Sequence, residues 1–376
     1  MSKLEELINE LCPNGVNYLS IGSVITRIRE KGKENPEISQ VYVVSNTQGI
    51  VRAEEYRENT IHSEDTSNYT IIRENMVAYN PSRLNIGSIA RLKSSDAGLV
   101  SPMYVVFSID ESKMRYEYFD YMIKSSYVVN KIDSFKEEGA RYRFDFSRWD
   151  WILIPIPPLE IQDEIVRILN TFKGLTAELT AELTARKKQY EYYRDYLLGN
   201  AKHAEYLSLN NLAKIKNGKD YKMLEDGEIP VYGSGGIMTY VNQYAYDKPS
   251  VLIPRKGSID KLYYVTKPFW NVDTIFYTEI KTETILPKYL YYLLQKEHLE
   301  QYNTAGGVPS LTQSVLNKIE LLVPPLEEQE RIVSILDRFD SLCNDISIGL
   351  PAEIKARQKQ YEYYRDKLLT FKRLED

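Results

Sequence analysis

Basic and amide side chains in short loops are the residues of this chain best suited to chemistry, and that chemistry is the recognition of nucleic-acid bases. Arginine reads guanine and asparagine or glutamine reads adenine in the major groove of DNA, while lysine, serine and tyrosine beside them bind phosphates. A solvated surface loop explains any single one of them equally well. The candidate DNA-binding residues are Arg83, Asn85, Arg141, Tyr142, Arg143, Arg255, Lys256, Ser258, Ser310, Thr312 and Gln313.

Two of these loops occupy equivalent places in the chain. Gly139 and Gly306 lie at the same distance before a Pro-Pro-Leu-Glu sequence, so residues 140–143 correspond to residues 307–311. The two loops differ in sequence, as we expect of two readers of different DNA sequences. Simple divergence of surface loops is the alternative.

No catalytic centre is recognisable. The histidines His62, His203 and His298 are scattered and match neither a zinc spacing nor a nucleophile-base pair. The glycine-rich run 233–236 lacks the Lys-Ser/Thr of a phosphate-binding loop, so we expect a turn there. Residues 80–82 begin like the Asn-Pro-Pro-aromatic motif of amino-methyltransferases but differ from it at the third and fourth positions. We therefore expect no catalytic residue, no metal site and no cofactor in this chain.

The elements that position the loops can be inferred from an internal repeat. The sequence ARKKQYEYYRDYLL at 185–198 recurs as ARQKQYEYYRDKLL at 356–369, with two differences. Upstream, PPLEIQDEIVRILNTF at 157–172 recurs as PPLEEQERIVSILDRF at 324–339. The longer segments before each pair share almost no continuous identity. The chain is thus a tandem duplication, in which two nearly identical helical segments accompany two different globular parts.

Each globular part is expected to be a compact α+β domain. Short β-branched or aromatic runs bounded by Asn, Gly, Ser and Pro predict strands, and aromatic residues recurring at three and four predict a helix at 116–130 and another at 287–301. The predicted strands are 41–44, 50–51, 77–79, 86–92 and 104–107 in the first half and 229–232, 251–253, 262–265 and 274–277 in the second.

Each helical segment is expected to form a coiled coil. Apolar residues across 165–179 recur at spacings of three and four, and a helix over 159–198 would be about 60 Å long. The first segment repeats Thr-Ala-Glu-Leu at 176–183, and each such unit lengthens a helix by about 6 Å. The second contains Gly-Leu-Pro at 349–351, which should interrupt the helix. The tetrapeptide repeat is therefore suited to setting a distance.

Composition limits the class of protein. The chain has 376 residues, of which 43% are hydrophobic, enough for two or three folded domains. A net charge of −5 excludes an extended basic surface, so a DNA-binding surface must be a local cluster. The first residues do not form a signal peptide, and no apolar run approaches the roughly 20 residues that span a bilayer. Cys12 and Cys343 match no metal or redox spacing. We expect a cytoplasmic protein without membrane contact.

These features resemble the specificity (S) subunit of type I restriction-modification systems. The resemblance rests on the Pro-Pro-Leu-Glu-x-Gln helix starts at 157–162 and 324–329, the Tyr-Glu-Tyr-Tyr-Arg-Asp blocks at 190–195 and 361–366, and the Thr-Ala-Glu-Leu repeats, and it covers the whole chain. It implies an α+β fold with two target-recognition domains that alternate with two long antiparallel coiled-coil helices, related by a pseudo-twofold tandem duplication. The implied domains are a first target-recognition domain at 1–155, a central conserved helix at 156–200, a second target-recognition domain at 201–323 and a C-terminal conserved helix at 324–376.

The resemblance also implies the partners. In that family each recognition domain reads one half of a split double-stranded DNA sequence, and the helices set the gap. Two methyltransferase subunits would dock on the helices, bind S-adenosylmethionine and methylate an adenine in each half-site. Two restriction subunits, using ATP and magnesium, would cleave unmodified DNA, and this chain would itself be non-catalytic. The residues expected to dock partners are Gln162, Tyr190, Tyr193, Arg194, Gln329, Tyr361, Tyr364 and Arg365.

Two other classes of protein are alternative interpretations of this sequence. A duplicated coiled-coil scaffold that binds two partner copies without reading DNA would explain the matched helical segments, but not why the globular parts diverged. A DNA-modifying enzyme with its own catalytic site would need a motif that the sequence does not show.

Overall fold

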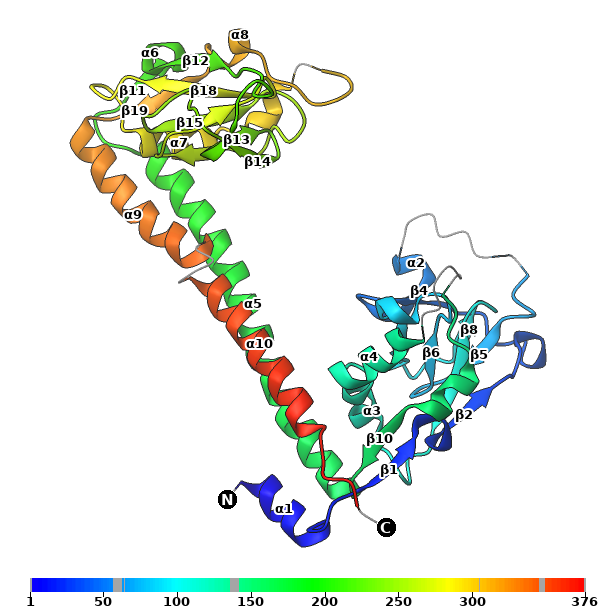
Figure 1. Ribbon diagram of the computed structural model, residues 1–376. Coiled ribbons are helices and arrows are strands. Elements are labelled where there is room, and N and C mark those ends of the chain that lie inside the picture. Colours follow the sequence, from blue (N-terminus) through cyan, green and yellow to red (C-terminus); the bar gives the residue numbers. More distant parts are fainter. Residues whose placement is uncertain are drawn as a thin grey trace. The chain divides into compact units, whose positions relative to one another are not determined.

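A continuous helix of 41 residues, α5 (Leu159–Gly199), joins the two halves of the chain (Figure 1). The computed structural model describes residues 2–56, 63, 65–135, 142–303, 305–344 and 349–374. The chain forms two compact units: the first unit is Met1–Glu178 with Lys355–Asp376, and the second unit is Leu179–Ile354. Each unit thus combines one globular part with helical residues from both copies of the repeat.

Within the described residues, the globular part of the first unit contains two four-stranded sheets and a two-stranded ribbon. One sheet, β2-β9-β6-β7, is antiparallel throughout, and the other, β4-β3-β8-β5, has one parallel pair, β3 with β8. The antiparallel ribbon pairs β1 with β10. The strands of this globular part are β1 (Asn17–Ser20), β2 (Ile25–Ile28), β3 (Val41–Ser45), β4 (Gly49–Arg52), β5 (Thr70–Ile72), β6 (Val77–Tyr79), β7 (Ile89–Arg91), β8 (Gly98–Val100), β9 (Val105–Ile109) and β10 (Leu153–Ile156). Its helices before α5 are α1 (Lys3–Leu11), α2 (Ala53–Tyr56), α3 (Tyr116–Met122) and α4 (Ser126–Ser134), with short 3-10 turns η1 (Ile21–Val24), η2 (Gly32–Glu34), η3 (Leu84–Ile86) and η4 (Phe146–Trp151).

The second unit repeats this architecture with an almost unrelated sequence. An antiparallel sheet, β12-β18-β15-β16, stands beside a mixed sheet, β14-β13-β17, whose parallel pair is β13 with β17, and a ribbon pairs β11 with β19. Its strands are β11 (Glu205–Ser208), β12 (Ala213–Asn217), β13 (Asp226–Gly233), β14 (Gly236–Val241), β15 (Ser250–Pro254), β16 (Tyr263–Val265), β17 (Trp270–Asn271), β18 (Ile275–Ile280) and β19 (Glu320–Val323). Its helices are α6 (Leu209–Leu212), α7 (Pro287–Lys296), η5 (Leu299–Tyr302), α8 (Gln313–Leu316) and α9 (Leu326–Asn344). The predicted α+β fold and the duplication are confirmed.

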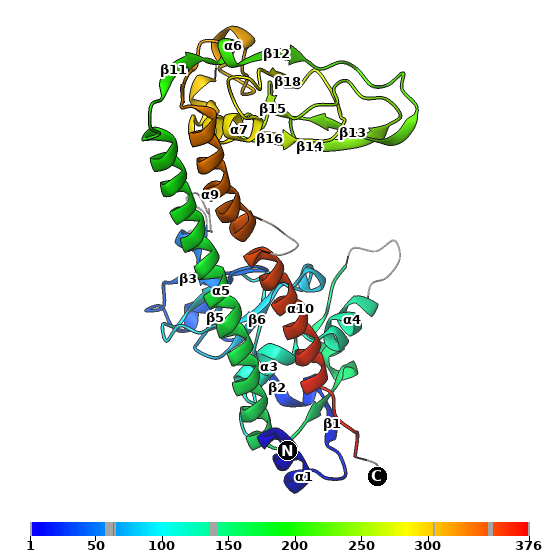
Figure 2. The same cartoon turned by 90° about the vertical axis from the view of Figure 1, so that its left-hand side faces the viewer.

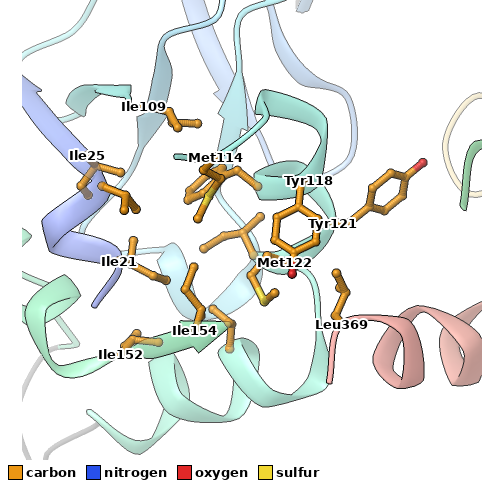
Figure 3. Close-up of a cluster of buried hydrophobic side chains, with 14 of the residues drawn as sticks. Ile21, Ile25, Ile109, Met114, Tyr118, Tyr121, Met122, Ile152, Ile154 and Leu369 are labelled. Atoms are coloured by element: carbon orange, nitrogen blue, oxygen red, sulfur yellow. The ribbon is translucent and has the colours of Figure 1, made fainter. Parts of the chain in front are cut away.

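Matched tyrosines attach each globular part to its ribbon. The hydroxyl of Tyr118 in α3 donates to the carbonyl of Pro155 at 3.3 Å, and the hydroxyl of Tyr289 in α7 donates to the carbonyl of Leu322 at 3.4 Å. Both rings are fully buried. Figure 3 shows Tyr118 in the core of the first unit, in one apolar cluster with Ile154 of β10 and Leu369. The core is therefore closed by residues far apart in the sequence.

In each unit a second helix lies along α5, as both views show (Figures 1 and 2). In the first unit this is α10 (Leu350–Leu368), and in the second it is α9. The predicted interruption is confirmed, because α9 ends at Asn344 and α10 begins at Leu350, directly before the proline. Within the described residues, no helix is both long and apolar enough to cross a membrane.

Three predicted elements are divided or shortened in the structure, each because a local turn interrupts the pattern. The helix expected at 116–130 is two helices, since the Ser125 hydroxyl accepts from the Val128 N–H and starts α4 anew. The helix expected at 287–301 ends at Lys296, before His298 adopts a positive φ of 45°. The strand expected at 86–92 is only β7, because Gly87 lies in the left-handed region at φ 85°.

Candidate nucleic-acid interface and docking helices

A hydrogen-bonded turn between β6 and β7 presents Arg83 to solvent. The Arg83 N–H donates to the Asn80 carbonyl at 3.0 Å, and the Arg83 carbonyl accepts from the Ser88 N–H at 3.1 Å. The adjacent Leu84 is buried and anchors the turn, whereas Asn85 is half-buried. Among the described residues the Arg83 guanidinium has no ion-pair partner. An exposed guanidinium on a fixed turn is suited to direct readout or phosphate binding.

A second predicted loop lies against this turn. The Phe144 N–H donates to the Pro81 carbonyl at 2.9 Å, and the Tyr79 hydroxyl donates to the Phe144 carbonyl at 3.2 Å. The neighbouring Arg143 side chain is 70% exposed and bonds Asp145 at 3.2 Å. The structure thus brings the segment of Arg143 beside the turn of Arg83. Arg141 lies outside the described residues.

Tyr142 does not fit the role predicted for it. Its ring packs against the core of the first unit, and its hydroxyl is buried with no hydrogen-bond partner among the described residues. Burial, reinforced by the nearby Asp133 carboxylate, raises the pKa of Tyr142 to about 12. The prediction that this hydroxyl contacts DNA is corrected: the ring closes the core beneath Arg143.

In the second unit the structure joins the two predicted loops. The Arg255 carbonyl accepts from the Leu311 N–H at 2.9 Å, the Gly257 N–H donates to the Pro309 carbonyl at 2.9 Å, and Lys256 forms an antiparallel bridge with Ser310. Lys256 is exposed, whereas Ser258 and Ser310 are half-buried. The guanidinium of Arg255 lies 5.9 Å from the centroid of the Phe276 ring. These contacts bring Arg255, Lys256 and Ser258 beside Ser310 and the residues that follow it.

The remaining two predicted residues of this unit begin helix α8. The Gln313 amide donates to the Ile215 carbonyl at 3.3 Å and to Asn217 Oδ1 at 3.4 Å, so β12 fixes its orientation. The exposed Thr312 hydroxyl bonds that of Ser314 at 3.1 Å. The glycine-rich run before β14 is a hairpin turn, as predicted, with Gly233 paired to Gly236.

Gln162 and Gln329 are fully buried, which corrects the prediction that they dock a partner. The Gln162 amide donates to the carbonyls of Pro157 and Lys113, both at 2.8 Å, and its oxygen accepts from the Arg115 N–H at 2.8 Å. Gln329 makes the same three bonds to the equivalent residues Pro324, Thr284 and Leu286. Hydrogen bonds of Gln162 thus connect the start of α5 to the loop before α3, and those of Gln329 connect the start of α9 to the loop before α7.

The Tyr-Arg-Asp part of each block is also internal. Tyr190 and Tyr361 are at least nine-tenths buried. Arg194 lies 5.9 Å from the centroid of the Tyr190 ring and bonds Asp195, and Arg365 does the same with Tyr361 and Asp366. Only 8% and 11% of the two arginine side chains are exposed. The prediction of a docking role is therefore corrected for these four residues, whose side chains hold each unit together.

The exposed face of each block combines residues that the sequence did not single out with the predicted docking residues Tyr193 and Tyr364. Tyr192 is 65% exposed and Tyr363 is 62% exposed, and both touch the partly exposed tyrosine that follows. One helical turn before them the chain places exposed Lys188 and Lys359. These paired residues form what we call the repeat face. Their shared exposure leaves these residues accessible to another molecule in both copies of the repeat.

In the part of the chain that the structure describes, no three His, Cys, Asp or Glu side chains gather as a metal ion would require.

Comparisons with known proteins agree on one family. The family model described as "Type I restriction modification DNA specificity domain" matches residues 21–186 and 202–356. The EcoR124I/EcoR124II specificity subunit of Escherichia coli is 36% identical over 309 residues, which cover 72% of this chain and 74% of that subunit. A protein of Haemophilus influenzae, described as "Putative type I restriction enzyme specificity subunit", is 35% identical over 260 residues, which cover 61% of this chain and 67% of that protein. The HsdS subunit of Thermoanaerobacter tengcongensis shares the fold with a TM-score of 0.51 at 17% identity, covering 96% of both chains.

Proposed function

We propose, from the premise that this chain belongs to the type I restriction-modification DNA specificity family, that it binds double-stranded DNA and reads a split sequence, one half with each globular part. One observation carries the proposal. Gln162 and Gln329, Tyr118 and Tyr289, and the two Tyr-Arg-Asp sets make the same contacts in both units, whereas the exposed polar loops differ. Two equivalent scaffolds with different loops suit two different half-sites.

The repeat face would dock two copies of one partner. Tyr192 belongs to the second unit and Tyr363 to the first, so each unit offers one copy of the same surface. Identical surfaces that occur twice in one chain favour two identical partners. We assign these partners as methyltransferase subunits that bind S-adenosylmethionine. Two restriction subunits, with ATP and magnesium, would complete the complex, and this chain would contribute recognition without catalysis.

The test is methylome sequencing of a host without restriction that expresses this chain with its methyltransferase, compared with the methyltransferase alone. We expect a new N6-methyladenine motif, split by a fixed gap. A co-purifying complex that yields no new motif would favour a scaffold without DNA readout.

Loop variants assign the half-sites in the same experiment. Replacing Arg83 and Arg143 with alanine should relax one half-site, and replacing Arg255 and Lys256 should relax the other, since the pairs lie in different units. A loss of each specific base contact costs about 1–3 kcal/mol of discrimination. Relaxation of the same half-site by both variants would contradict the assignment of one half-site to each unit.

A further inference from the structure

A polar cavity of about 310 Å3 in the first unit lies between the β3–β4 turn, the region of β7 and the end of α3. Four cationic side chains and one carboxylate line it. The carboxylate, Asp120, is bonded by Arg91, with 2.9 Å between Nη2 and Oδ2. The other three cations are Lys93, Lys124 and Lys173, and we call this site the lysine cavity.

The positive charge of the cavity is not compensated. Within the described ranges none of the three lysines forms an ion pair with a carboxylate. Lys93 and Lys173 also border a neighbouring hollow that contains Glu74, Glu111 and Glu117. Glu117 pairs with Arg91 at 3.1 Å and Glu111 with Arg115 at 4.0 Å, so Glu74 alone of these three carries an unpaired negative charge there. The excess of positive charge therefore favours an anion in the lysine cavity over one in the neighbouring hollow.

Lys173 is held in position by an aromatic ring. Its ammonium nitrogen lies 4.2 Å from the centroid of the Tyr121 ring, and the Tyr121 hydroxyl donates to Asn170 Oδ1 at 2.6 Å. Figure 3 shows Tyr121 directed away from the apolar cluster, with its hydroxyl at the outer end. Desolvation, followed by the charges of Lys124 and Lys93, lowers the pKa of Lys173. An anion bound among these lysines would relieve their mutual repulsion.

The opposite wall offers neutral hydrogen-bonding groups. The Ser45 hydroxyl accepts from the N–H groups of Thr47 and Gln48, at 3.3 and 3.2 Å, which closes the β3–β4 turn. Gly49 completes it at a positive φ of 77°. The turn thereby places Asn46, Thr47 and Gln48 in the cavity wall. Ammonium, amide and hydroxyl donors around one space suit a group with several oxygens, such as phosphate.

The cavity belongs to the first unit and is no part of the duplicated surface. Asp340 stands in the second repeat where Lys173 stands in the first, and Asp337 stands where Asn170 stands. A surface for two identical partners would keep the same charge in both copies. This reversal of charge indicates a contact that only the first globular part makes.

We propose that the lysine cavity binds a phosphate group of the DNA backbone through Lys93, Lys124 and Lys173. The inference rests on the proposed function and deepens it, because it names a contact that positions the duplex in the first unit without reading its sequence.

The test compares the complex of this subunit and its methyltransferase with a complex carrying Lys93→Ala, Lys124→Ala and Lys173→Ala together. Affinity for the cognate duplex and for an unrelated duplex should fall by a similar factor, roughly tenfold or more. The slope of log affinity against log salt concentration should become shallower by about one, the loss of one phosphate contact. The methylated motif should stay the same. Lys173→Arg, which keeps the charge, should retain most of the affinity. Lys131→Ala, which removes an exposed lysine of α4 outside the cavity, should leave the salt dependence unchanged.

The outcomes separate this inference from the proposed function. A wild-type complex that methylates a split motif, together with a triple variant of unchanged affinity and salt dependence, would overturn the phosphate contact alone. A wild-type complex that binds no DNA and methylates no motif would overturn both. Thermal stabilisation by inorganic phosphate that the triple variant lacks, without a difference in DNA affinity, would assign the cavity to a free anion and overturn the backbone contact.

Discussion

Phe172 of α5 stacks on Tyr364 of α10, with ring centroids 5.5 Å apart and an interplanar angle of 21°. The second unit repeats this pair with the copies exchanged, since Phe339 of α9 stacks on Tyr193 of α5 at 5.8 Å and 25°. Each unit therefore joins the first matched block of one repeat to the second matched block of the other. The two repeats are interlocked, and neither sequence repeat forms a unit by itself.

This exchange predicts that Tyr364→Ala destabilises the first unit by about 1–2 kcal/mol, because the stacked pair and its buried area are lost. Hydrogen exchange resolved to each unit measures the effect. Tyr364→Phe keeps the ring and should be nearly neutral, and Tyr193→Ala should affect the second unit instead. Equal loosening of both units by Tyr364→Ala would contradict the pairing.

The repeat predicted the long helices, because two nearly identical segments should fold in the same way, and Gly-Leu-Pro at 349–351 predicted the interruption of the second one. It did not reveal which side chains face outward. Tyr190 and Tyr192 belong to the same block, but Tyr190 is buried and Tyr192 is 65% exposed. The difference arises because the two residues lie on different sides of α5, and only the fold decides which side is covered. The ribbons of β1 with β10 and β11 with β19 were also missed, since each joins strands more than 100 residues apart. The lysine cavity gathers Lys93, Lys124 and Lys173 from three distant segments, which no spacing in the sequence shows.

The buried glutamines predict a stability effect with an internal control. Gln162→Leu leaves the Arg115 N–H and the carbonyls of Lys113 and Pro157 without their partner. Since each buried unsatisfied group costs about 1–3 kcal/mol, the free energy of unfolding of the first unit should fall by about 2–4 kcal/mol. Gln329→Leu should do the same in the second unit, as followed by urea unfolding with unit-resolved hydrogen exchange. Unchanged exchange at the N–H of Arg115 would argue against this role.

Asp366 predicts an acid-dependent contribution to stability. Its carboxylate accepts from the Ser126 N–H at 3.1 Å and the Ser126 hydroxyl at 2.6 Å, and it bonds Arg365. Burial alone would raise the pKa of Asp366, but these bonds prevail and hold it below the ordinary value of 3.8. A lowered folded-state pKa means that the stabilisation is present above 3.8 and is lost as the pH falls through the folded value. The stability advantage of the wild type over Asp366→Asn should therefore shrink below about pH 4, measured by urea unfolding between about pH 6 and pH 3. An advantage that stays constant over this range would exclude the linkage.

The repeat face predicts that each exposed tyrosine supports one partner copy. Tyr192→Ala should weaken docking at the second unit and Tyr363→Ala docking at the first, so that each single variant favours a complex with one methyltransferase and the double variant favours the free subunit. A buried aromatic anchor at an interface is worth about 2 kcal/mol or more, which corresponds to roughly a thirtyfold weaker Kd. Native mass spectrometry counts the bound copies. Loss of both copies from either single variant would show that the two faces do not act independently.

The Thr-Ala-Glu-Leu repeat at 176–183 predicts control of the gap between half-sites. Helix α5 runs through this segment without a break, so an added unit should extend the helix by four residues, or about 6 Å, and rotate it by roughly 40° beyond one full turn. On DNA this rise corresponds to about one to two base pairs. Methylome sequencing of the insertion variant should therefore show a longer gap with both half-sites unchanged. Deleting one unit is the matched control and should shorten the gap, whereas a change in the bases of either half-site would contradict a purely spacing role.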